Sequence, residues 1–254
     1  LDLSRDEVCD AVIKMITDVL KSAPISYVKW DMNRNITELG SPAWPPKKQK
    51  ELAHRYMLGL YKILENITSN FPDILFESCS GGGGRFDGGM LYYMPQTWTS
   101  DDTDAIERLK IQEGTSLVYP SISMGSHVSA VPNHQVNRIT PLSTRGIVAM
   151  AGSFGYELDV TKMTDIEKEE VKKQIELYKS IRKVVQFGDL YRLKSPFKSN
   201  EVSWMTLSKD KEFAIVSYVK QYSEVNKIPG RLKLKALDEN SLYEIIETKE
   251  VFGG

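Results

Sequence analysis

The chain has 254 residues, 41% of them apolar and 26% charged, which is the composition of an ordinary globular protein. Its net charge of −1 argues against a protein built mainly to bind nucleic acid, which needs a basic field to neutralise phosphates. No apolar run approaches the ~20 residues of a membrane span, and two cysteines are too few for a disulfide framework. We therefore expect no nucleic-acid or membrane partner, and a reducing, cytoplasmic location.

Helical and strand-like segments alternate over the first 190 residues. Ser4 and Glu7 have the spacing of a capping box, which predicts that a helix begins here. Its apolar stripe is Val8, Val12, Met15 or Ile16, and Val19. Strands are predicted at 25–31, 74–76, 96–99, 121–128 and 152–156. Further helices are predicted to begin at Pro45-Pro46, at Asp102 or Thr103, at Pro141 and at Thr164. In the last of these helices, Thr164 and Glu167 form a second capping box. Its apolar stripe consists of Ile166, Ile175, Tyr178, Ile181 and Val185.

Strands separated by helices are typical of parallel βαβ units, in which helices cover a buried sheet. About five strands are too few to close an eight-stranded barrel, so the missing strands are expected before Leu1. Beyond Gly188 the pattern changes to antiparallel strands, predicted at 202–207, 213–219, 232–235 and 242–246. A boundary near 188–198 therefore separates an α/β part from a small all-β part.

Three strand ends carry polar or reactive residues, and ligands of parallel α/β proteins bind at the carboxyl ends of strands. The first is Lys29-Trp30-Asp31-Met32-Asn33-Arg34, where strand alternation sends Lys29, Asp31 and Asn33 to one side. A cation, a carboxylate and an amide on one wall are costly to bury without a ligand. The alternative is a buried salt bridge followed by a turn.

The second strand end runs from Glu77 to Gly89 and has six glycines among the nine residues 81–89. Such a loop lets backbone approach a ligand closely, and a flexible structural loop is the alternative. The glycine-rich loop lacks the spacing of a dinucleotide or P-loop motif.

Possible metal ligands are isolated in the sequence. Cys79 has no second cysteine at ligand spacing, and His127 and His134 have no nearby third ligand. We expect no metal and no cofactor.

The third strand end is Trp98-Thr99-Ser100-Asp101-Asp102-Thr103-Asp104. Asp102 or Thr103 suits the helix N-cap and Asp104 suits the first turn, which leaves Asp101 facing the pocket. Asp31 and Asp101 would then be two carboxylates at strand ends of one sheet. Glycoside hydrolysis uses such a pair, one as the acid that protonates the leaving oxygen and one that attacks or activates water.

These three motifs, together with Met124-Gly125-Ser126-His127-Val128-Ser129, resemble the signature of glycoside hydrolase family 36, the microbial α-galactosidases of melibiase/raffinase type. The resemblance implies that Asp31 is the nucleophile and Asp101 the general acid/base. It also implies that Lys29, Asn33, Cys79 and the backbone around Gly82 bind galactose hydroxyls. Trp30 and Trp98 either stack on the sugar or fill the barrel rim.

The fold implied by the resemblance is a (β/α)8 barrel, of which residues 1–190 supply about five units. An antiparallel β domain follows over residues 191–254, and the alternative is that only part of this domain is present. The family's N-terminal sandwich and first barrel strands are absent, so we expect a fragment that is inactive by itself. The parent would be a homo-oligomeric retaining enzyme acting on α-galactoside oligosaccharides such as melibiose and raffinose. A galactosyltransferase of raffinose or stachyose synthase type and a non-catalytic sugar-binding fragment are the alternatives.

The implied retaining mechanism requires the two carboxyl groups to lie roughly 5–5.5 Å apart. It also requires one of them to be ionised while the other carries a proton. Lys29, two residues before Asp31, is expected to favour the charged nucleophile through its opposite charge.

Overall fold

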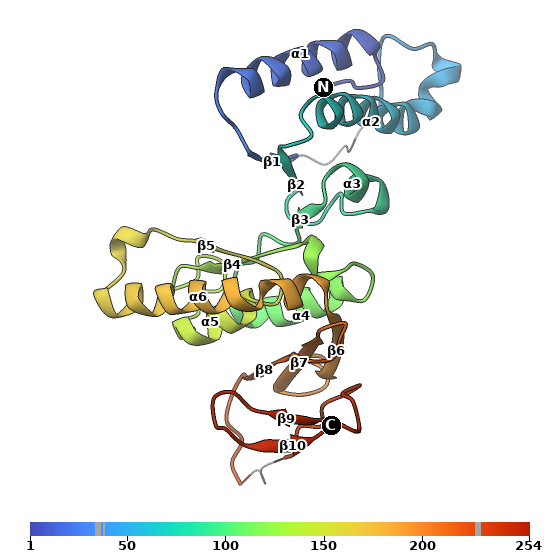
Figure 1. Ribbon diagram of the computed structural model, residues 1–254. Helices are drawn as coiled ribbons and strands as arrows, with labels where there is room; N and C mark the ends of the chain where they lie inside the picture. The colour runs from blue at the N-terminus through green and yellow to red at the C-terminus, as the bar shows by residue number, and fades with distance from the viewer. Residues whose placement is uncertain (34–36, 38, 227–229) are drawn as a thin grey trace. The chain divides into compact units, whose positions relative to one another are not determined.

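The computed structural model describes residues 1–33, 37, 39–226 and 230–254 (Figure 1). Arg34, the last residue of the first motif, lies outside the described residues. The chain folds into two compact units, Leu1–Trp98 and Thr99–Gly254, each of which has its own hydrophobic core.

The first unit is a three-stranded parallel sheet with helices on one face. Its elements are α1 (Asp6–Ser22), β1 (Tyr27–Asp31), the 3-10 helix η1 (Pro46–Glu51), α2 (Leu52–Asn70), β2 (Leu75–Cys79), α3 (Gly88–Tyr93) and β3 (Gln96–Trp98). β2 pairs in parallel with both β1 and β3, as βαβ units require. Val28, Trp30 and Phe76 pack with the apolar residues of α1 and α2, so the opposite face of the sheet is left for polar side chains.

Two details of the first unit differ from the sequence-based prediction. β1 alternates between exposed and half-buried residues and is not a buried strand, because the helices cover only one of its faces. α1 has no capping box. The Ser4 hydroxyl donates instead to Asp2 and accepts a hydrogen bond from the indole of Trp44, while Glu7 is paired with Arg5.

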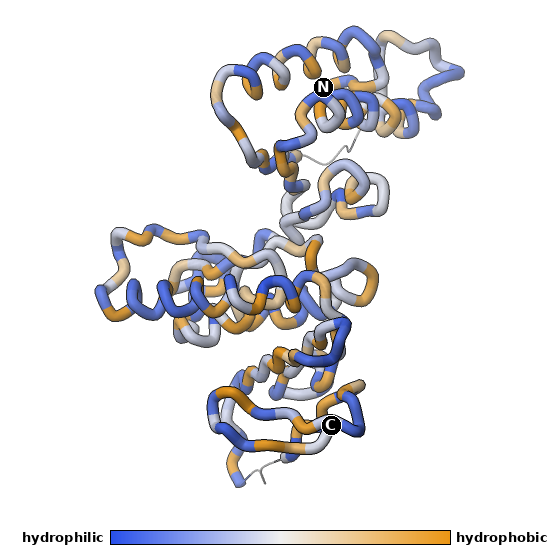
Figure 2. The backbone as a smooth tube through the Cα atoms, in the orientation of Figure 1, coloured by the Kyte–Doolittle hydropathy of each residue, from blue (hydrophilic) through white to orange (hydrophobic). Residues whose placement is uncertain are grey.

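The contacting stripe of α1 is centred on Cys9, Val12, Ile16 and Leu20, which recur at the i, i+3, i+4 intervals of one helix face. Figure 2 shows hydrophobic and hydrophilic residues alternating along α1 and α2. Of the two predicted alternatives, Ile16 packs against the core and Met15 is exposed. The prediction of Val19 as a core residue is wrong, since its side chain is also exposed.

The second unit combines a parallel strand pair with antiparallel sheets. Its elements are α4 (Ala105–Ser116), η2 (Ser121–Ser123), β4 (Met124–Ser129), α5 (Leu142–Ala149), β5 (Ser153–Glu157), η3 (Val160–Lys162), α6 (Asp165–Phe187), β6 (Asp189–Lys194), β7 (Glu201–Leu207), β8 (Ala214–Lys220), β9 (Leu242–Glu244) and β10 (Val251–Gly253). β4 and β5 pair in parallel, and their apolar side chains Val128, Phe154 and Tyr156 pack with residues of α5 and α6.

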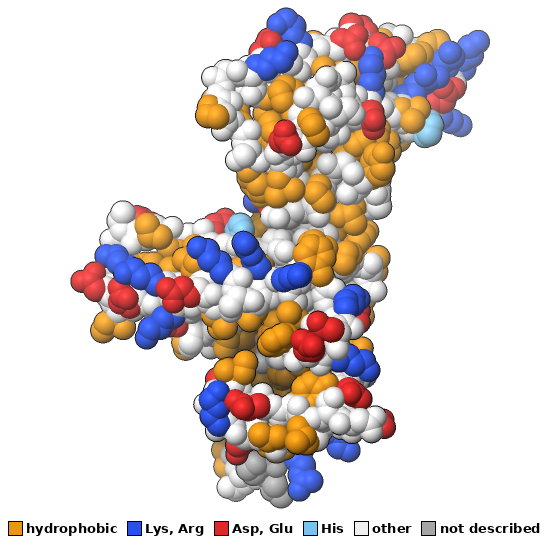
Figure 3. Space-filling model, in the orientation of Figure 1, with side chains coloured by type: hydrophobic (Ala, Val, Ile, Leu, Met, Phe, Trp, Pro, Cys, Tyr) orange, Lys and Arg blue, Asp and Glu red, His pale blue; other side chains and the backbone are white. Residues whose placement is uncertain are grey.

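The capping box that begins α6 is confirmed, with Thr164 and Glu167 each bonding the other's backbone N–H. Ile166 in the first turn is 83% exposed, so its prediction as a stripe residue is wrong. α6 begins to contact the core one turn later, at Val171. Figure 3 shows charged side chains along the exposed side of this helix. Lys172 and Glu169 form an exposed ion pair in α6, with Nζ 2.5 Å from Oε1.

The antiparallel sheet β6-β7-β8 packs against helices of the same unit. Val202 of β7 and Val219 of β8 share a core cluster with Ala105 and Leu109 of α4 and Val148 of α5. A separate hairpin-like pair is formed by β9 and β10. β6 and β10 were not predicted.

The predicted strand at 232–235 is wrong, because these residues are irregular in the structure. Ala236 directly after them has a φ of 58°, in the left-handed region, which is incompatible with a continuing strand. No helix in the described part of the chain is both long and apolar enough to cross a membrane.

We predict opposite effects of alanine at two helical glycines. A Cβ at Gly59 in α2 would lie 1.8 Å from the Leu3 carbonyl oxygen, whereas a Cβ at Gly114 in α4 has nothing within 4 Å. Gly59→Ala should lower the free energy of unfolding by about 1–3 kcal/mol through overpacking. Gly114→Ala should raise it by about 0.5–1 kcal/mol, because glycine is the poorer helix former.

Urea unfolding of the two variants, followed by circular dichroism, checks this prediction. Equal effects of the two substitutions would show that the close approach of α2 to Leu3 is not present in the folded protein.

Candidate active site

The register of the first sheet aligns three polar side chains on the face away from the helices. Lys29 of β1 pairs with Glu77 of β2, and Glu77 pairs with Gln96 of β3. The Glu77 carboxylate is fully buried and accepts hydrogen bonds on one oxygen from the Tyr27 hydroxyl and the Gln96 amide. Burial together with the Glu77 contact raises the pKa of Tyr27, which keeps its hydroxyl a donor.

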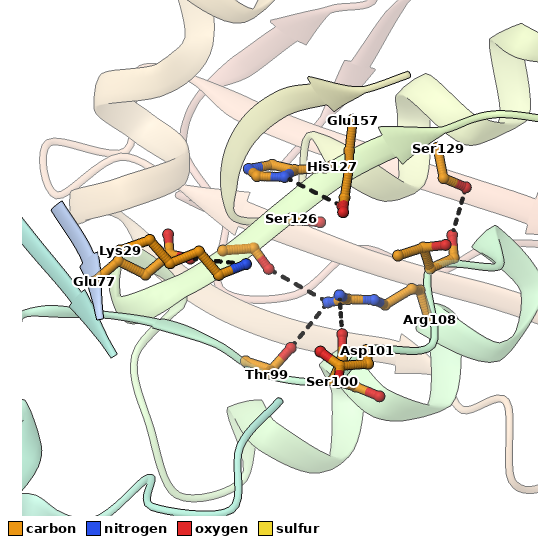
Figure 4. Close-up of polar contacts among 12 residues, drawn as sticks. Lys29, Glu77, Thr99, Ser100, Asp101, Arg108, Ser126, His127, Ser129 and Glu157 are labelled. Carbon is orange, nitrogen blue, oxygen red and sulfur yellow. Dashed lines mark hydrogen bonds and ion pairs between the residues drawn. The ribbon is translucent and has the colours of Figure 1, made fainter. Parts of the chain in front are cut away.

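The Lys29 ammonium lies between a carboxylate and an aromatic face. Its Nζ is 3.7 Å from the second oxygen of Glu77 and 4.5 Å from the centroid of the Trp98 ring. Figure 4 shows the Lys29 side chain directed at Glu77. Lys29 therefore forms an ion pair with Glu77, but its side chain is 38% exposed, so the pair differs from the buried salt bridge of the alternative. Sequence reasoning did not single out Glu77, although strand alternation places it on the same face as Cys79.

Asp31 ends β1 directly opposite Cys79. Hydrogen bonds from neighbouring groups, which form a cluster around its carboxylate, act on its pKa. Partial burial works to raise its pKa, but hydrogen bonds from the side chains of Cys79 and Asn33 and the backbone of Met32 and Gly81 outweigh that effect. The pKa of Asp31 is therefore lowered, and the carboxyl is ionised at neutral pH. These hydrogen bonds cause the lowering, and the predicted effect of the Lys29 charge is not among its causes.

The Cys79 thiol is the buried member of this cluster. Burial raises its pKa, and the hydrogen bond to Asp31 acts in the same direction, so the thiol stays protonated and can donate. The backbone of Gly82 contacts the sulfur in turn. Arg85 donates to the Cys79 carbonyl oxygen over 3.0 Å, which holds the end of β2.

The glycine-rich loop after β2 is a tight turn that serves this cluster. Gly81 and Gly82 have φ values of 54° and 84°, in the left-handed region that favours glycine. Ser80 N–H donates to Gly82 O over 2.8 Å, and Gly84 N–H donates to Ser80 O over 3.2 Å. Because these amides are used within the turn, the loop favours the structural alternative over a phosphate cradle.

The two predicted tryptophans have different surroundings. Trp98 is buried under the Lys29 ammonium, on the polar face of the sheet. Trp30 lies on the opposite face of β1 from Lys29 and Asp31 and packs against the hydrophobic core. This placement favours the packing alternative for Trp30.

Asp101 lies in the second unit, in a segment without helix or strand that precedes α4. The N-cap of α4 is Asp104, whose carboxylate accepts from the backbone N–H of Ile106 and Glu107 at 3.0 Å each. The prediction of Asp102 or Thr103 as the cap is wrong, because the Asp102 side chain instead accepts the Asp104 N–H and forms the turn before the helix. Asp101 is exposed and takes no part in the cap.

His127 lies within β4 and Glu157 ends β5, and the two side chains are 3.7 Å apart, from Nδ1 to Oε2 (Figure 4). A Cβ at Gly155 would be 2.8 Å from the His127 ring, so glycine makes room for the imidazole. Among the described residues, no group of three or more histidine, cysteine or acidic side chains is arranged to hold a metal ion.

We predict that Cys79→Ala raises the pKa of Asp31, since it removes a hydrogen bond to the ionised carboxylate. Cys79→Ser should keep the pKa low because its hydroxyl can donate in the same place. A carboxyl whose folded pKa is depressed adds stability above its unfolded pKa, and this contribution is lost as the pH falls through the folded pKa. In Cys79→Ala, the free energy of unfolding should therefore fall less with decreasing pH, because the contribution of Asp31 to it is smaller.

Titration of the Asp31 carboxyl carbon by NMR measures this shift. Cys9→Ala is the matched control, because the Cys9 thiol donates to the Leu3 carbonyl oxygen and not to a carboxylate. A low pKa retained in Cys79→Ala would exclude the thiol as the cause.

Comparison with known proteins identifies the family. The Melibiase family model matches residues 1–188, and the model of the glycosyl hydrolase family 36 C-terminal domain matches residues 201–254. Alpha-galactosidase AgaA of Geobacillus stearothermophilus is 63% identical over the whole chain, and alpha-galactosidase Mel36A of Lactobacillus acidophilus is 52% identical. The chain spans 35% of the length of each of these relatives.

Solved structures agree with this result. The crystal structure of AgaA superimposes with a TM-score of 0.98 at 62% identity, covering all of this chain and 35% of that one. Variants of AgaA in complex with raffinose and with stachyose match equally well. These matches confirm the predicted fold class, a partial parallel barrel followed by antiparallel strands. The chain belongs to the melibiase family, glycoside hydrolase family 36.

Proposed function

We propose that this chain is the part of a retaining α-galactosidase that carries both catalytic carboxylates, with Asp31 as nucleophile and Asp101 as general acid/base. The observation that carries the proposal is the hydrogen-bond cluster around Asp31, which holds one carboxyl ionised at a strand end. Relatives named as α-galactosidases, one of them crystallised with raffinose and stachyose, support an α-galactoside oligosaccharide as the substrate.

In this mechanism the Asp31 carboxylate attacks the anomeric carbon while the Asp101 carboxyl gives its proton to the departing oxygen. A galactosyl ester forms on Asp31 and the glycosidic C–O bond breaks. Water, deprotonated by Asp101, then hydrolyses the ester and returns both groups to their starting states. The working enzyme requires the two carboxyls roughly 5–5.5 Å apart.

We assign sugar recognition to the polar side chains around Asp31. Lys29 has ammonium hydrogens to donate to hydroxyls, and its position is defined by Glu77 and Trp98. Asn33 and Cys79 touch the nucleophile, and the backbone at Gly82 lies next to the Cys79 sulfur. Trp98 contributes the aromatic wall behind Lys29, and we assign Trp30 to the core.

We further propose that residues 1–190 are the partial catalytic barrel and residues 191–254 the C-terminal β domain of a longer, homo-oligomeric polypeptide. Because the chain spans 35% of its relatives' length, part of the galactose pocket is expected in the remainder of that polypeptide. The cytoplasmic location, which rests on the number of cysteines, stays a prediction.

The full-length polypeptide is expected to hydrolyse melibiose and p-nitrophenyl α-galactoside, and this chain alone to hydrolyse neither. Activity of the isolated chain would contradict the incomplete pocket. Galactosyl transfer to a sugar acceptor in preference to water, measured from the product ratio, would identify a galactosyltransferase instead.

Asp31→Ala in the full-length enzyme should lower kcat/KM by at least about 10³-fold, as the loss of a nucleophile does in other enzymes. Sodium azide should restore turnover of an activated α-galactoside, because azide occupies the space of the lost carboxylate. The azide attacks from the nucleophile's side, so the product should be β-galactosyl azide.

NMR of the product gives its anomeric configuration. Asp18→Ala is the control, since Asp18 is an exposed residue of α1 that forms an ion pair with Lys14. Wild-type hydrolysis rates in Asp31→Ala would remove Asp31 from the mechanism.

A further inference from the structure

The segment from Thr99 to Thr103 carries Asp101 but has neither helix nor strand of its own. Its backbone groups therefore lack the regular partners that secondary structure supplies and must find others. A general acid must also be held to within ~0.5 Å of its working position. What fixes this backbone therefore bears directly on the chemistry proposed for Asp101.

Arg108 in α4 binds the segment from the buried side. Only 3% of its surface is exposed, and its guanidinium donates to Asp102 O over 2.7 Å, to Ser100 O over 2.6 Å and to Thr99 Oγ1 over 2.9 Å. A longer bond of 3.3 Å reaches Gly125 O in β4. Figure 4 shows the guanidinium directed into this segment. The two carbonyl groups that it binds flank Asp101 on either side.

Gln135, in the loop after β4, binds the segment from the exposed side. Its amide nitrogen donates to the carbonyl oxygen of Asp101, and its amide oxygen accepts the N–H of Thr103 over 2.9 Å. Three consecutive carbonyls, those of residues 100, 101 and 102, are therefore each held by a side chain from elsewhere in the fold.

Asn133 holds the second of these side chains in place. Its side-chain oxygen accepts the N–H of Gln135 over 2.9 Å, and its side-chain nitrogen donates to the Thr103 hydroxyl over 3.0 Å. Asn133 is buried, so this contact ties the loop after β4 to the segment before α4.

We propose that Arg108 and Gln135 are positioning residues that place the Asp101 carboxyl for proton transfer to the leaving group. This inference rests on the proposed function. The planar fork of a guanidinium binds several acceptors in one fixed geometry, and the single ammonium of lysine cannot reproduce it. Loosening the segment leaves the Asp101 carboxyl chemically unchanged but displaces it from the glycosidic oxygen.

The test compares two substrates in the full-length enzyme. Melibiose has a sugar hydroxyl as its leaving group and needs protonation, whereas 2,4-dinitrophenyl α-galactoside has a leaving group that departs without it. Arg108→Lys and Gln135→Ala should lower kcat/KM for melibiose by about 10²-fold, the scale of a small misplacement of a catalytic group. The kcat/KM for the dinitrophenyl substrate should stay within a few-fold of wild type.

Arg145→Lys is the matched control. Arg145 is also a buried arginine that donates to backbone carbonyls, Thr140 O over 2.9 Å and Ser129 O over 2.6 Å, but it does not touch the Asp101 segment. It should change kcat/KM for both substrates by the same factor, as a purely structural substitution does.

Asp101→Ala distinguishes a failure of the proposed acid role of Asp101 from a failure of the positioning role of Arg108 and Gln135. If it shows no difference between the substrates, Asp101 is not the acid and the proposed function fails. If Asp101→Ala shows the difference but Gln135→Ala and Arg108→Lys reduce both substrates equally, the positioning role is overturned and the function stands. Gln135 is exposed, so Gln135→Ala decides the question even if Arg108→Lys does not fold.

Discussion

The positions of the polar residues around Asp31 depend on one constraint, the parallel pairing of β1 with β2. It sets Asp31 opposite Cys79 and Lys29 opposite Glu77, so that two rows of polar side chains lie on the face that the helices leave uncovered. A shift of β1 by one residue would turn Lys29 and Asp31 toward the hydrophobic core. Core packing of Val28 and Phe76 therefore specifies the chemistry on the opposite face.

The two proposed catalytic carboxylates are held in different ways, and the difference fits their roles. Asp31 receives hydrogen bonds on the carboxylate itself, which favour the ionised form that a nucleophile needs. The bonds around Asp101 end on its backbone and on that of its neighbours. Such support defines the position of the residue that is proposed to transfer the proton.

A buried charged group lies near each of the two aspartates, Glu77 near Asp31 and Arg108 near Asp101. Burying a charge raises the free energy of the folded state unless the group has hydrogen-bond or ion-pair partners. Glu77 meets this cost with Tyr27 and Gln96 on one oxygen and the Lys29 ammonium near the other. Arg108 meets it by binding backbone carbonyls that have no place in a sheet or helix. In both cases a buried charged side chain binds partly exposed residues next to it.

The sequence alone determined the five parallel strands with the helices α1, α2, α4, α5 and α6 between and after them. It also determined that Asp31 ends a strand, that Asp101 follows one, and that α6 begins with a capping box. These features depend on alternation and on residues three or four apart, which can be read locally. Only the tertiary structure decided the contacts that Glu77, Arg108 and Gln135 make. It also decided that Ser4 binds Asp2 and Trp44 and does not cap α1. Their partners lie on other elements, Gln135 being 34 residues from Asp101. Hydrogen bonds over such separations exist only after strands have paired and helices have packed, and no local pattern encodes them.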